Sequence, residues 1–204
     1  TGMLVGCSFQ SNPLVSTPDV KPEDLGLFVR ISKDNNITII SPTSEIGQGT
    51  HTAHAMIIAE ELDADWENIN VVTTNNINSE YNTDSWGVYT GGNRGIRFWW
   101  DRLRVIGAGT RELLVTAGAQ KMDVPLIECT AQNGHVVHLP SGRQLSFGEL
   151  ALIASKLKPS SNPRLNSQEK FRFVGKPMRR VDIPKKVNGS AVYSSDIRLP
   201  GMLY

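Results

Sequence analysis

The sequence has few cysteines, no excess of either charge and no long apolar run. Among its 204 residues only Cys7 and Cys129 are cysteines, and two thiols outside a Cys-x-x-Cys pair do not form a metal site by themselves. The chain has 21 Lys and Arg against 20 Asp and Glu, and its basic residues form no stripe interleaved with aromatics, which argues against a nucleic-acid partner. No apolar stretch is long enough to span a bilayer.

The usual catalytic signatures are also missing. The chain has no Gly-x-Ser-x-Gly elbow, no His-Glu-x-x-His pair, no phosphate loop and no dinucleotide fingerprint. A zinc site built from His51 and His54 with Glu60 or Glu61 is an alternative that the spacing disfavours. The acidic run that ends at Glu67 falls on a helix end and its exit loop, where we expect a solvated face. We predict no catalytic residue and no metal ligand within this chain.

The first residues favour export. The chain begins at Thr1 without a methionine, which indicates that an upstream segment has been removed or left out. Leu4-Val5-Gly6 places small residues just before Cys7, as at the end of a bacterial lipoprotein signal. The alternative is a short apolar strand with an isolated cysteine. Export predicts a periplasmic or cell-envelope location, with residues 1–25 as an exported lead-in.

Periodicity predicts an α+β chain of hairpins and strands with two long helices. We expect strands at 27–32, 37–40, 69–73, 126–131 and 191–193, and hairpins at the first two strands and around Asn133-Gly134. Helices are expected from about 50 to 62, along a pattern from 96 to 117, and from a capping box at Ser146–Glu149 to about 157. Arg102, Arg104, Arg111 and Glu112 lie off the apolar line of the second helix. We also expect Cys129 to be a core thiol and the hairpin at His135 and His138 to be exposed.

The segment Glu45-Ile46-Gly47-Gln48-Gly49-Thr50-His51 predicts a ligand-binding loop. Glycines allow a backbone to approach a ligand closely, and the first N–H groups of a helix have no partner within it. The helix that follows has Ala55, Ile58, Ala59 and Leu62 as one apolar stripe, with Thr50 or Thr52 available as its cap. A plain strand-to-helix turn is the competing interpretation, because a short Gly-x-Gly is a weak signal by itself.

A second glycine-rich loop precedes the second helix. It combines glycines, hydroxyls and aromatics from Ser85 to Arg94, with Gly91-Gly92 at its end. Two such loops in one domain could face the same ligand from two sides, whereas the simpler interpretation is an ordinary helix start.

These motifs in combination resemble the molybdopterin-binding subunit of the xanthine oxidase family. The stretch Ser44–Thr52, running into Ile57–Asp63, is similar to the Glu-Met-Gly-Gln-Gly-x-His element of that family. Within the family it resembles the large subunits of the isoquinoline 1-oxidoreductase type and related bacterial aldehyde dehydrogenases. Further agreement lies in Thr90–Asn93, in Ala117–Lys121 before Val124-Pro125, and in Gly175–Asp182 through to Leu199–Tyr204.

The resemblance implies roles for eight residues in binding a molybdenum–molybdopterin cofactor, in its cytosine dinucleotide form. Gln48 would hydrogen-bond the pterin, Gly47, Gly49 and Thr50 would lend backbone donors, and His51 would neighbour the ligand. Gly91, Gly92 and Asn93 would contribute the second loop, although Asn93-Arg94 stands where the family has small hydroxyl residues.

The resemblance also implies an organisation and a set of partners. Residues 26–166 would form part of the cofactor-binding domain, and 167–204 would begin a mixed α/β hammerhead-like domain. The parent large subunit, continuing beyond Tyr204, would hydroxylate an aldehyde or N-heterocycle and pass electrons to a partner carrying 2Fe–2S clusters, with a cytochrome c as possible acceptor. The fragment alone would be inactive, since the family's catalytic glutamate lies further on. The alternative is a degenerate binding or assembly module without cofactor.

Overall fold

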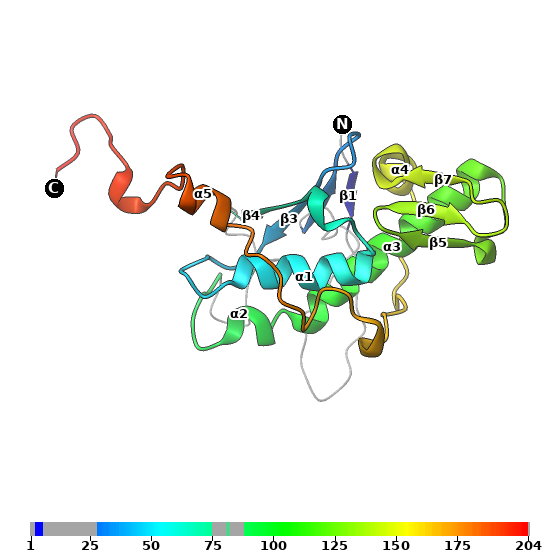
Figure 1. Cartoon of the computed structure of the whole chain (residues 1–204), viewed down its shortest axis with the longest axis horizontal. Helices are drawn as coiled ribbons and strands as arrows, with labels where there is room; N and C mark the ends of the chain where they lie inside the picture. Colours follow the sequence, from blue (N-terminus) through cyan, green and yellow to red (C-terminus); the bar gives the residue numbers. More distant parts are fainter. Residues whose placement is uncertain (1–2, 6–27, 75–80, 82–87, 204) are drawn as a thin grey trace.

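The computed structural model describes residues 3–5, 28–74, 81 and 88–203 of the chain. The fold combines helices with two small sheets (Figure 1), which confirms the predicted α+β class. The predicted lead-in over residues 1–25, including Cys7, lies almost entirely outside the described residues. Within the described part of the chain, no helix is both long and apolar enough to cross a membrane.

A four-stranded sheet carries one side of the core. Its order is β1-β2-β3-β4, in which β1, β2 and β3 are antiparallel neighbours while β4 runs parallel to β3. The strands are β1 (Met3–Val5), β2 (Val29–Ile31), β3 (Ile37–Ser41) and β4 (Ile69–Thr73). The predicted hairpin and the strand at 69–73 are therefore confirmed, and the parallel pair needs a crossover, which is the first helix.

Helix α1 (Thr50–Leu62) makes this crossover and has the predicted bounds. The apolar stripe is fully buried, as the spacing predicts. The predicted threonine cap is wrong, because the N-cap is Gly49 in a left-handed conformation with φ of 82° and no side-chain cap. Thr52 instead accepts a hydrogen bond from the N–H of Val181 at 3.1 Å.

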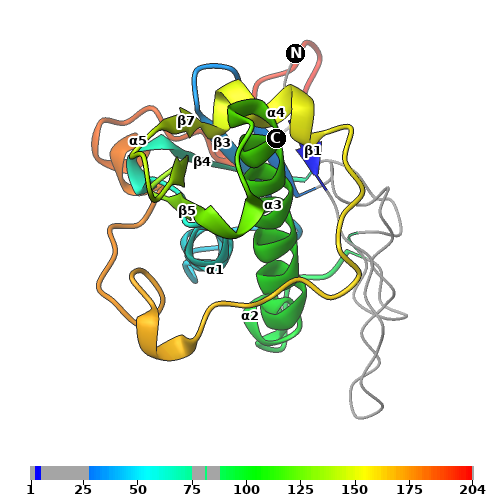
Figure 2. The ribbon, with the colours of Figure 1, turned by 90° about the vertical axis from the view of Figure 1, so that its right-hand side faces the viewer.

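The second helical pattern divides into two helices. The short α2 (Arg94–Arg97) is followed by a turn at Phe98 and Trp99, and then by α3 (Trp100–Met122). Helix α3 crosses α1 (Figure 2) and packs against it. At the crossing, a Cβ added to Gly107 would lie 2.8 Å from the backbone oxygen of Ile58.

The second sheet lies beside the C-terminal half of α3. Its antiparallel strands are β5 (Cys129–Gln132), β6 (His135–His138) and β7 (Gln144–Ser146), followed by α4 (Phe147–Ala154). The Asn133-Gly134 hairpin and the Ser146–Glu149 capping box are confirmed, although α4 ends three residues before the predicted end near Leu157. Short 3₁₀ helices link the elements: η2 (Trp66–Asn68), η5 (Leu126–Glu128), η6 (Gln168–Lys170) and η7 (Ser194–Asp196). Because η5 takes up residues 126–128, strand β5 begins at Cys129, three residues later than predicted.

The predicted solvated face at the end of α1 is wrong for two residues. Glu60 and Glu61 are buried, because a later segment crosses over them. Glu60 accepts hydrogen bonds from the N–H groups of Arg172, Phe173 and Val174 at 2.8, 2.6 and 3.0 Å. These bonds replace water around a buried carboxylate, which is the condition under which such a group is tolerated.

Glu61 is held by arginines of α3. Arg104 pairs with its carboxylate at 2.6 Å, Arg111 lies 3.6 Å from the other carboxylate oxygen, and the N–H of Asn166 donates to it at 2.8 Å. Arg111 also donates to the backbone oxygen of Glu61. Arg102 and Arg104 are themselves buried although they lie off the apolar line. Arg102 stacks over Trp99 with its guanidinium carbon 4.9 Å from the ring centre.

The hairpin of the second sheet also differs from expectation. Cys129 is a free thiol and is only partly buried. His138 is buried, with its ring between the Ser141 hydroxyl at 2.6 Å and the Glu128 carboxylate at 2.8 Å. The N–H of Gly142 bonds His138 O and that of Arg143 bonds Ser141 Oγ. Ser141, His138 and Glu128 are thus hydrogen-bonded in a row, as in a nucleophilic triad. Both N–H groups that follow the serine are already engaged, so the described hairpin offers no oxyanion hole next to it, and the three side chains stabilise the turn.

The C-terminal segment runs away from the rest of the molecule (Figure 1) and contains α5 (Ile183–Val187). The strand predicted at 191–193 is wrong: these residues have no regular structure and belong to neither of the two described sheets. Several apolar side chains of this segment are exposed, including Val187, Val192, Leu199 and Leu203. The predicted boundary near Asn166 stays a prediction.

Candidate functional site

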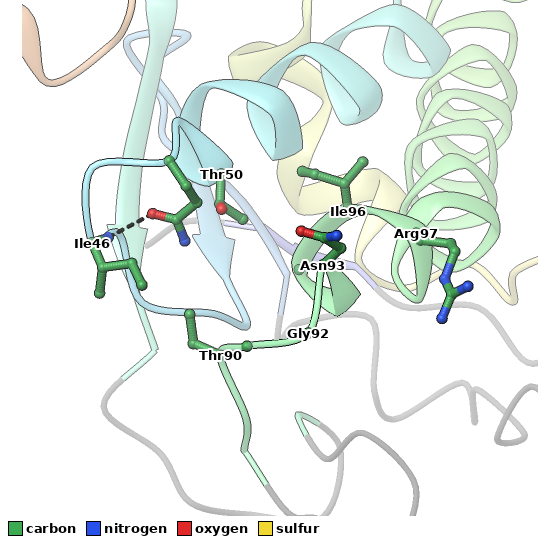
Figure 3. A pocket seen from close by; sticks show the side chains of 10 residues that line it. Ile46, Thr50, Thr90, Gly92, Asn93, Ile96 and Arg97 are labelled. Carbon is green, nitrogen blue, oxygen red and sulfur yellow. Dashed lines mark hydrogen bonds between the residues drawn. The ribbon is translucent and has the colours of Figure 1, made fainter.

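The two glycine-rich loops meet at one cavity of about 570 Å³. This volume lies within the range of small-molecule sites. The lining comes from the loop before α1 and the first residue of α1, and from the loop before α2 and α2 itself (Figure 3): Ile46, Gln48, Thr50, Thr90, Gly91, Gly92, Asn93, Gly95, Ile96 and Arg97. The two loops therefore face one cavity, as one of the two interpretations of the sequence predicts. A further bond joins them, from the N–H of Ser44 to the Thr90 hydroxyl at 2.9 Å.

Five of the eight predicted cofactor-binding residues line this cavity. They are Gln48, Thr50, Gly91, Gly92 and Asn93. Gly47, Gly49 and His51 are not among the lining residues, and their contact with a ligand stays a prediction.

The start of α1 is already occupied by an anion from the chain itself. The carboxylate of Glu45 accepts hydrogen bonds from the N–H groups of Gly47 and Gly49, both at 2.9 Å, and of His51 at 3.1 Å. The N–H groups of the two glycines are therefore engaged within the loop itself, and their donation to a cofactor stays a prediction. The sequence signal was present, because a carboxylate a few residues before a helix is the ordinary partner of its first N–H groups.

Glu45 is stabilised in its charged form. Desolvation would raise its pKa, but the N–H groups of Gly49, His51 and Gly47 and the charge of Arg180 outweigh it and hold the pKa below the ordinary 4.5. Arg180 reaches Glu45 at 3.3 Å, donates to the backbone oxygen of Gly47 at 2.9 Å, and pairs with Asp182 at 2.7 Å. The first loop is thus fixed from outside by a residue far along the chain, which no local pattern predicts.

Gln48 folds back on its own loop but keeps hydrogen-bonding capacity. Its Oε1 accepts from the N–H of Ile46 at 2.7 Å, shown dashed in Figure 3, and its Nε2 donates to the oxygen of Ser44 at 2.9 Å. A primary amide has two hydrogens and two acceptor lone pairs. One hydrogen and one lone pair therefore remain for a ligand.

Two residues of the second loop fit its local geometry. A Cβ at Gly91 would lie 2.5 Å from the hydroxyl oxygen of Tyr89, so a side chain there would make the Tyr89 ring move. Asn93 has a φ of 56°, in the left-handed region that Asn tolerates better than Ser or Thr. Its side chain makes no capping bond to α2. The left-handed backbone gives a physical reason for an Asn where the resemblance leads one to expect a small hydroxyl residue.

The two histidines of α1 have different positions. His51 bonds Thr73 Oγ1 at 3.0 Å and lies 3.3 Å from the oxygen of Thr43, behind the first loop. His54 is fully buried and bonds Ser41 and Gly95. The sequence pattern indicated only a zinc-ligand role for this residue. Desolvation lowers the pKa of His54 to about 4 despite its bond to Gly95. Among the described residues, no group of three His, Cys, Asp or Glu side chains could hold a metal ion.

The chemistry of the lining suits binding rather than catalysis. Amides of Gln48 and Asn93 and hydroxyls of Thr50 and Thr90 can pair with the edges of a polar heterocycle. Arg97 is the one ionisable group among the described lining residues, and Figure 3 shows its guanidinium pointing away from Ile46 and Thr50. A guanidinium at one end matches an anionic group such as a phosphate. The set fits a pterin with a phosphate-bearing tail and contains no carboxylate base.

Comparison with known proteins shows a match to one protein family and similarity to three relatives. A family described as "Molybdopterin cofactor-binding domain" matches residues 3–194. The beta chain of isoquinoline 1-oxidoreductase from Brevundimonas diminuta is 34% identical over 93% of this chain and 29% of its own length. A membrane-bound aldehyde dehydrogenase (pyrroloquinoline-quinone) of Gluconacetobacter polyoxogenes is 32% identical over 87% of this chain and 23% of its own length. A nicotinate dehydrogenase subunit of Pseudomonas putida is 30% identical over 92% of this chain and 15% of its own length. The chain thus spans less than a third of the length of each relative.

Proposed function

Because this chain belongs to the molybdopterin cofactor-binding domain family, we propose that it is the part of a molybdenum hydroxylase large subunit that holds the pterin of the cofactor between its two glycine-rich loops. The observation that carries the proposal is the single cavity on which both loops converge, lined by amides, hydroxyls and one guanidinium. Such a lining can orient a polar heterocycle without reacting with it.

Each lining group has a distinct task in this proposal. The free amide hydrogen and lone pair of Gln48 would pair with the pterin edge, and the Asn93 amide would bind it from the opposite loop. Gly91, without a side chain, would let the cofactor approach the backbone closely, and Arg97 would bind the phosphate of the cofactor tail. When bound, the cofactor supplies the metal centre at which an aldehyde or N-heterocycle carbon is hydroxylated.

The whole protein would need further parts. Two relatives are named as subunits of isoquinoline 1-oxidoreductase and nicotinate dehydrogenase, which supports a partner protein, proposed to carry 2Fe–2S clusters and to deliver electrons to a cytochrome c. The substrate would be a small aldehyde or N-heterocycle, held by the remainder of the large subunit. We also propose the cytosine dinucleotide form of the cofactor and a periplasmic location, with no turnover by this fragment alone.

The test measures molybdenum, oxidised-pterin fluorescence and pyrroloquinoline quinone in the parent large subunit, produced with its partner in a molybdenum-replete host. Wild-type protein should hold near-stoichiometric molybdenum and pterin and no quinone. Gln48→Ala and Asn93→Gly should each weaken retention about tenfold, because each removes a ligand hydrogen bond. Glycine keeps the left-handed backbone at position 93.

Two matched controls separate binding from folding. Gln120→Ala removes an exposed glutamine at the end of α3, and Asn133→Gly replaces another left-handed asparagine, in the β5–β6 turn. Both should keep wild-type molybdenum. Wild-type content in the Gln48 and Asn93 variants would contradict the proposed contacts. Folded wild-type protein without metal or pterin would favour the degenerate module. Bound pyrroloquinoline quinone instead of molybdenum and pterin would show that the cofactor is a quinone.

A further inference from the structure

A buried histidine joins the helix behind the first loop to the second loop. His54 has no exposed surface and belongs to α1. Its Nδ1 lies 3.0 Å from Ser41 Oγ, and its Nε2 lies 2.6 Å from the backbone oxygen of Gly95 in α2. Gly95 lines the cavity, but His54 does not. The imidazole therefore acts on the cavity through the backbone of α2.

The partners fix the protonation of the ring. A carbonyl oxygen can only accept, so Nε2 must carry a hydrogen toward Gly95. In the neutral ring Nδ1 is then an acceptor, which requires the single hydroxyl hydrogen of Ser41 to point at Nδ1 rather than at the backbone oxygen of Thr43, since both acceptors lie 3.0 Å from Ser41 Oγ. Burial lowers the pKa of His54 to about 4, with His51 adding to this effect while the Gly95 bond and the charge of Glu45 oppose it. At neutral pH the ring is therefore neutral, in the Nε2–H tautomer.

Helix α2 depends on such an anchor. It consists of four residues, and a helix of about one turn is not stable by itself in water. Its contact with α1 is also close, since a Cβ at Gly95 would lie 3.3 Å from the Thr50 methyl carbon. The His54 bond and this packing contact hold α2 against α1, and the loop from Thr90 to Asn93 leads directly into α2.

We propose that His54 is a positioning residue whose Nε2–H bond to Gly95 sets the place of the second loop, and with it the width of the cavity. Its consequence for the cofactor rests on the proposed function, but the positioning itself does not. Loss of the bond would free α2 and the loop while leaving every lining side chain in the sequence unchanged.

The test compares His54→Gln and His54→Leu in the parent large subunit with its partner. Glutamine can place an amide N–H toward Gly95 and an acceptor toward Ser41, whereas leucine fills space without either bond. Val136→Ala is the control for general destabilisation, because Val136 is buried in the second sheet against Gly118, away from the cavity.

The primary readout is hydrogen exchange of a peptide covering residues 90–99, whose protected amides are Arg94, Phe98 and Trp99. His54→Leu should speed their exchange about tenfold, the factor that corresponds to one buried hydrogen bond. His54→Gln should restore slow exchange, and Val136→Ala should leave this peptide unchanged. Nitrogen-15 spectra of the wild-type ring should show the neutral Nε2–H tautomer at pH 7.

Molybdenum content is the second readout and separates the two proposals. Faster exchange together with metal loss in His54→Leu, rescued by glutamine, supports both. Faster exchange without metal loss supports positioning and contradicts the role of the second loop in cofactor retention. Unchanged exchange in His54→Leu, or a ring protonated on Nδ1 alone, overturns the positioning role whatever the metal content.

Discussion

At the scale of single residues, Glu45 determines how the first loop is built. Its carboxylate accepts from the N–H groups of Gly47 and Gly49 in the loop and of His51 in the first turn of α1, so the loop wraps around an internal anion. Glu45→Gln keeps the shape of the side chain but removes the charge and turns one acceptor oxygen into a donor. We expect it to lower the free energy of unfolding by about 1 kcal/mol at pH 7, the usual contribution of a carboxylate charge close to a helix N-terminus.

The pH dependence of this loss follows from the direction of the pKa shift. Because the folded-state pKa lies below the ordinary 4.5, the stabilisation is present above 4.5 and disappears as pH falls through the folded value. The gap between wild type and Glu45→Gln in urea unfolding should therefore narrow below pH 4.5. Exposed Glu67 is the control: Glu67→Gln should change little, and a constant gap for Glu45→Gln at all pH values would contradict the charge argument.

At the scale of elements, the crossing of α1 and α3 is set by Gly107. A Cβ there would lie 2.8 Å from both the backbone oxygen of Ile58 and the Cβ of Glu61, and neither atom belongs to a flexible side-chain end. Alanine is the better helix former by about 1 kcal/mol, but we expect Gly107→Ala to destabilise the chain by about 1–3 kcal/mol through overpacking. Urea unfolding at pH 7 measures the change.

A second glycine of α3 provides the comparison. A Cβ at Gly118 would meet only side chains, with Val136 Cγ1 at 2.5 Å and Val136 Cβ at 2.9 Å, so Val136→Ala should relieve part of the strain of Gly118→Ala by removing the shorter contact. No comparable second substitution exists for Gly107, because one of its neighbours is backbone. Equal or greater stability of Gly107→Ala would show that the helices can separate and that the crossing is not fixed there.

At the scale of the whole molecule, we expect acid to weaken the fold before the carboxylates are protonated. His54 has a folded-state pKa of about 4 against 6.5 in the unfolded chain. Between these values the unfolded state binds more protons, so stability is complete above 6.5 and falls as pH drops toward 4, by about 3 kcal/mol in total. The free energy of unfolding of the wild type should fall as pH drops from 6.5 to 4, whereas that of His54→Gln should lack this fall. The same slope in both proteins would assign it to other groups.

Elements near in sequence were predictable, and contacts between distant segments were not. The stripe of α1, the β2–β3 hairpin and the capping box at Ser146 follow from side-chain periodicity and local turn chemistry, which act within a few residues. The burial of Glu60 and Glu61 was missed because their partners lie far along the chain: Arg172 and Asn166 more than one hundred residues later, and Arg104 43 residues later.

For the candidate site, too, local features were predictable and long-range contacts were not. That two glycine-rich loops each precede a helix is readable from the residues alone, because glycine content and helix periodicity are local properties. It took the folded chain to show that Arg180 pairs with Glu45 and that His54 bonds the backbone of α2. Hydrogen bonds and ion pairs between distant residues depend on where the folded backbone places each atom, so their partners emerge only when the core has packed.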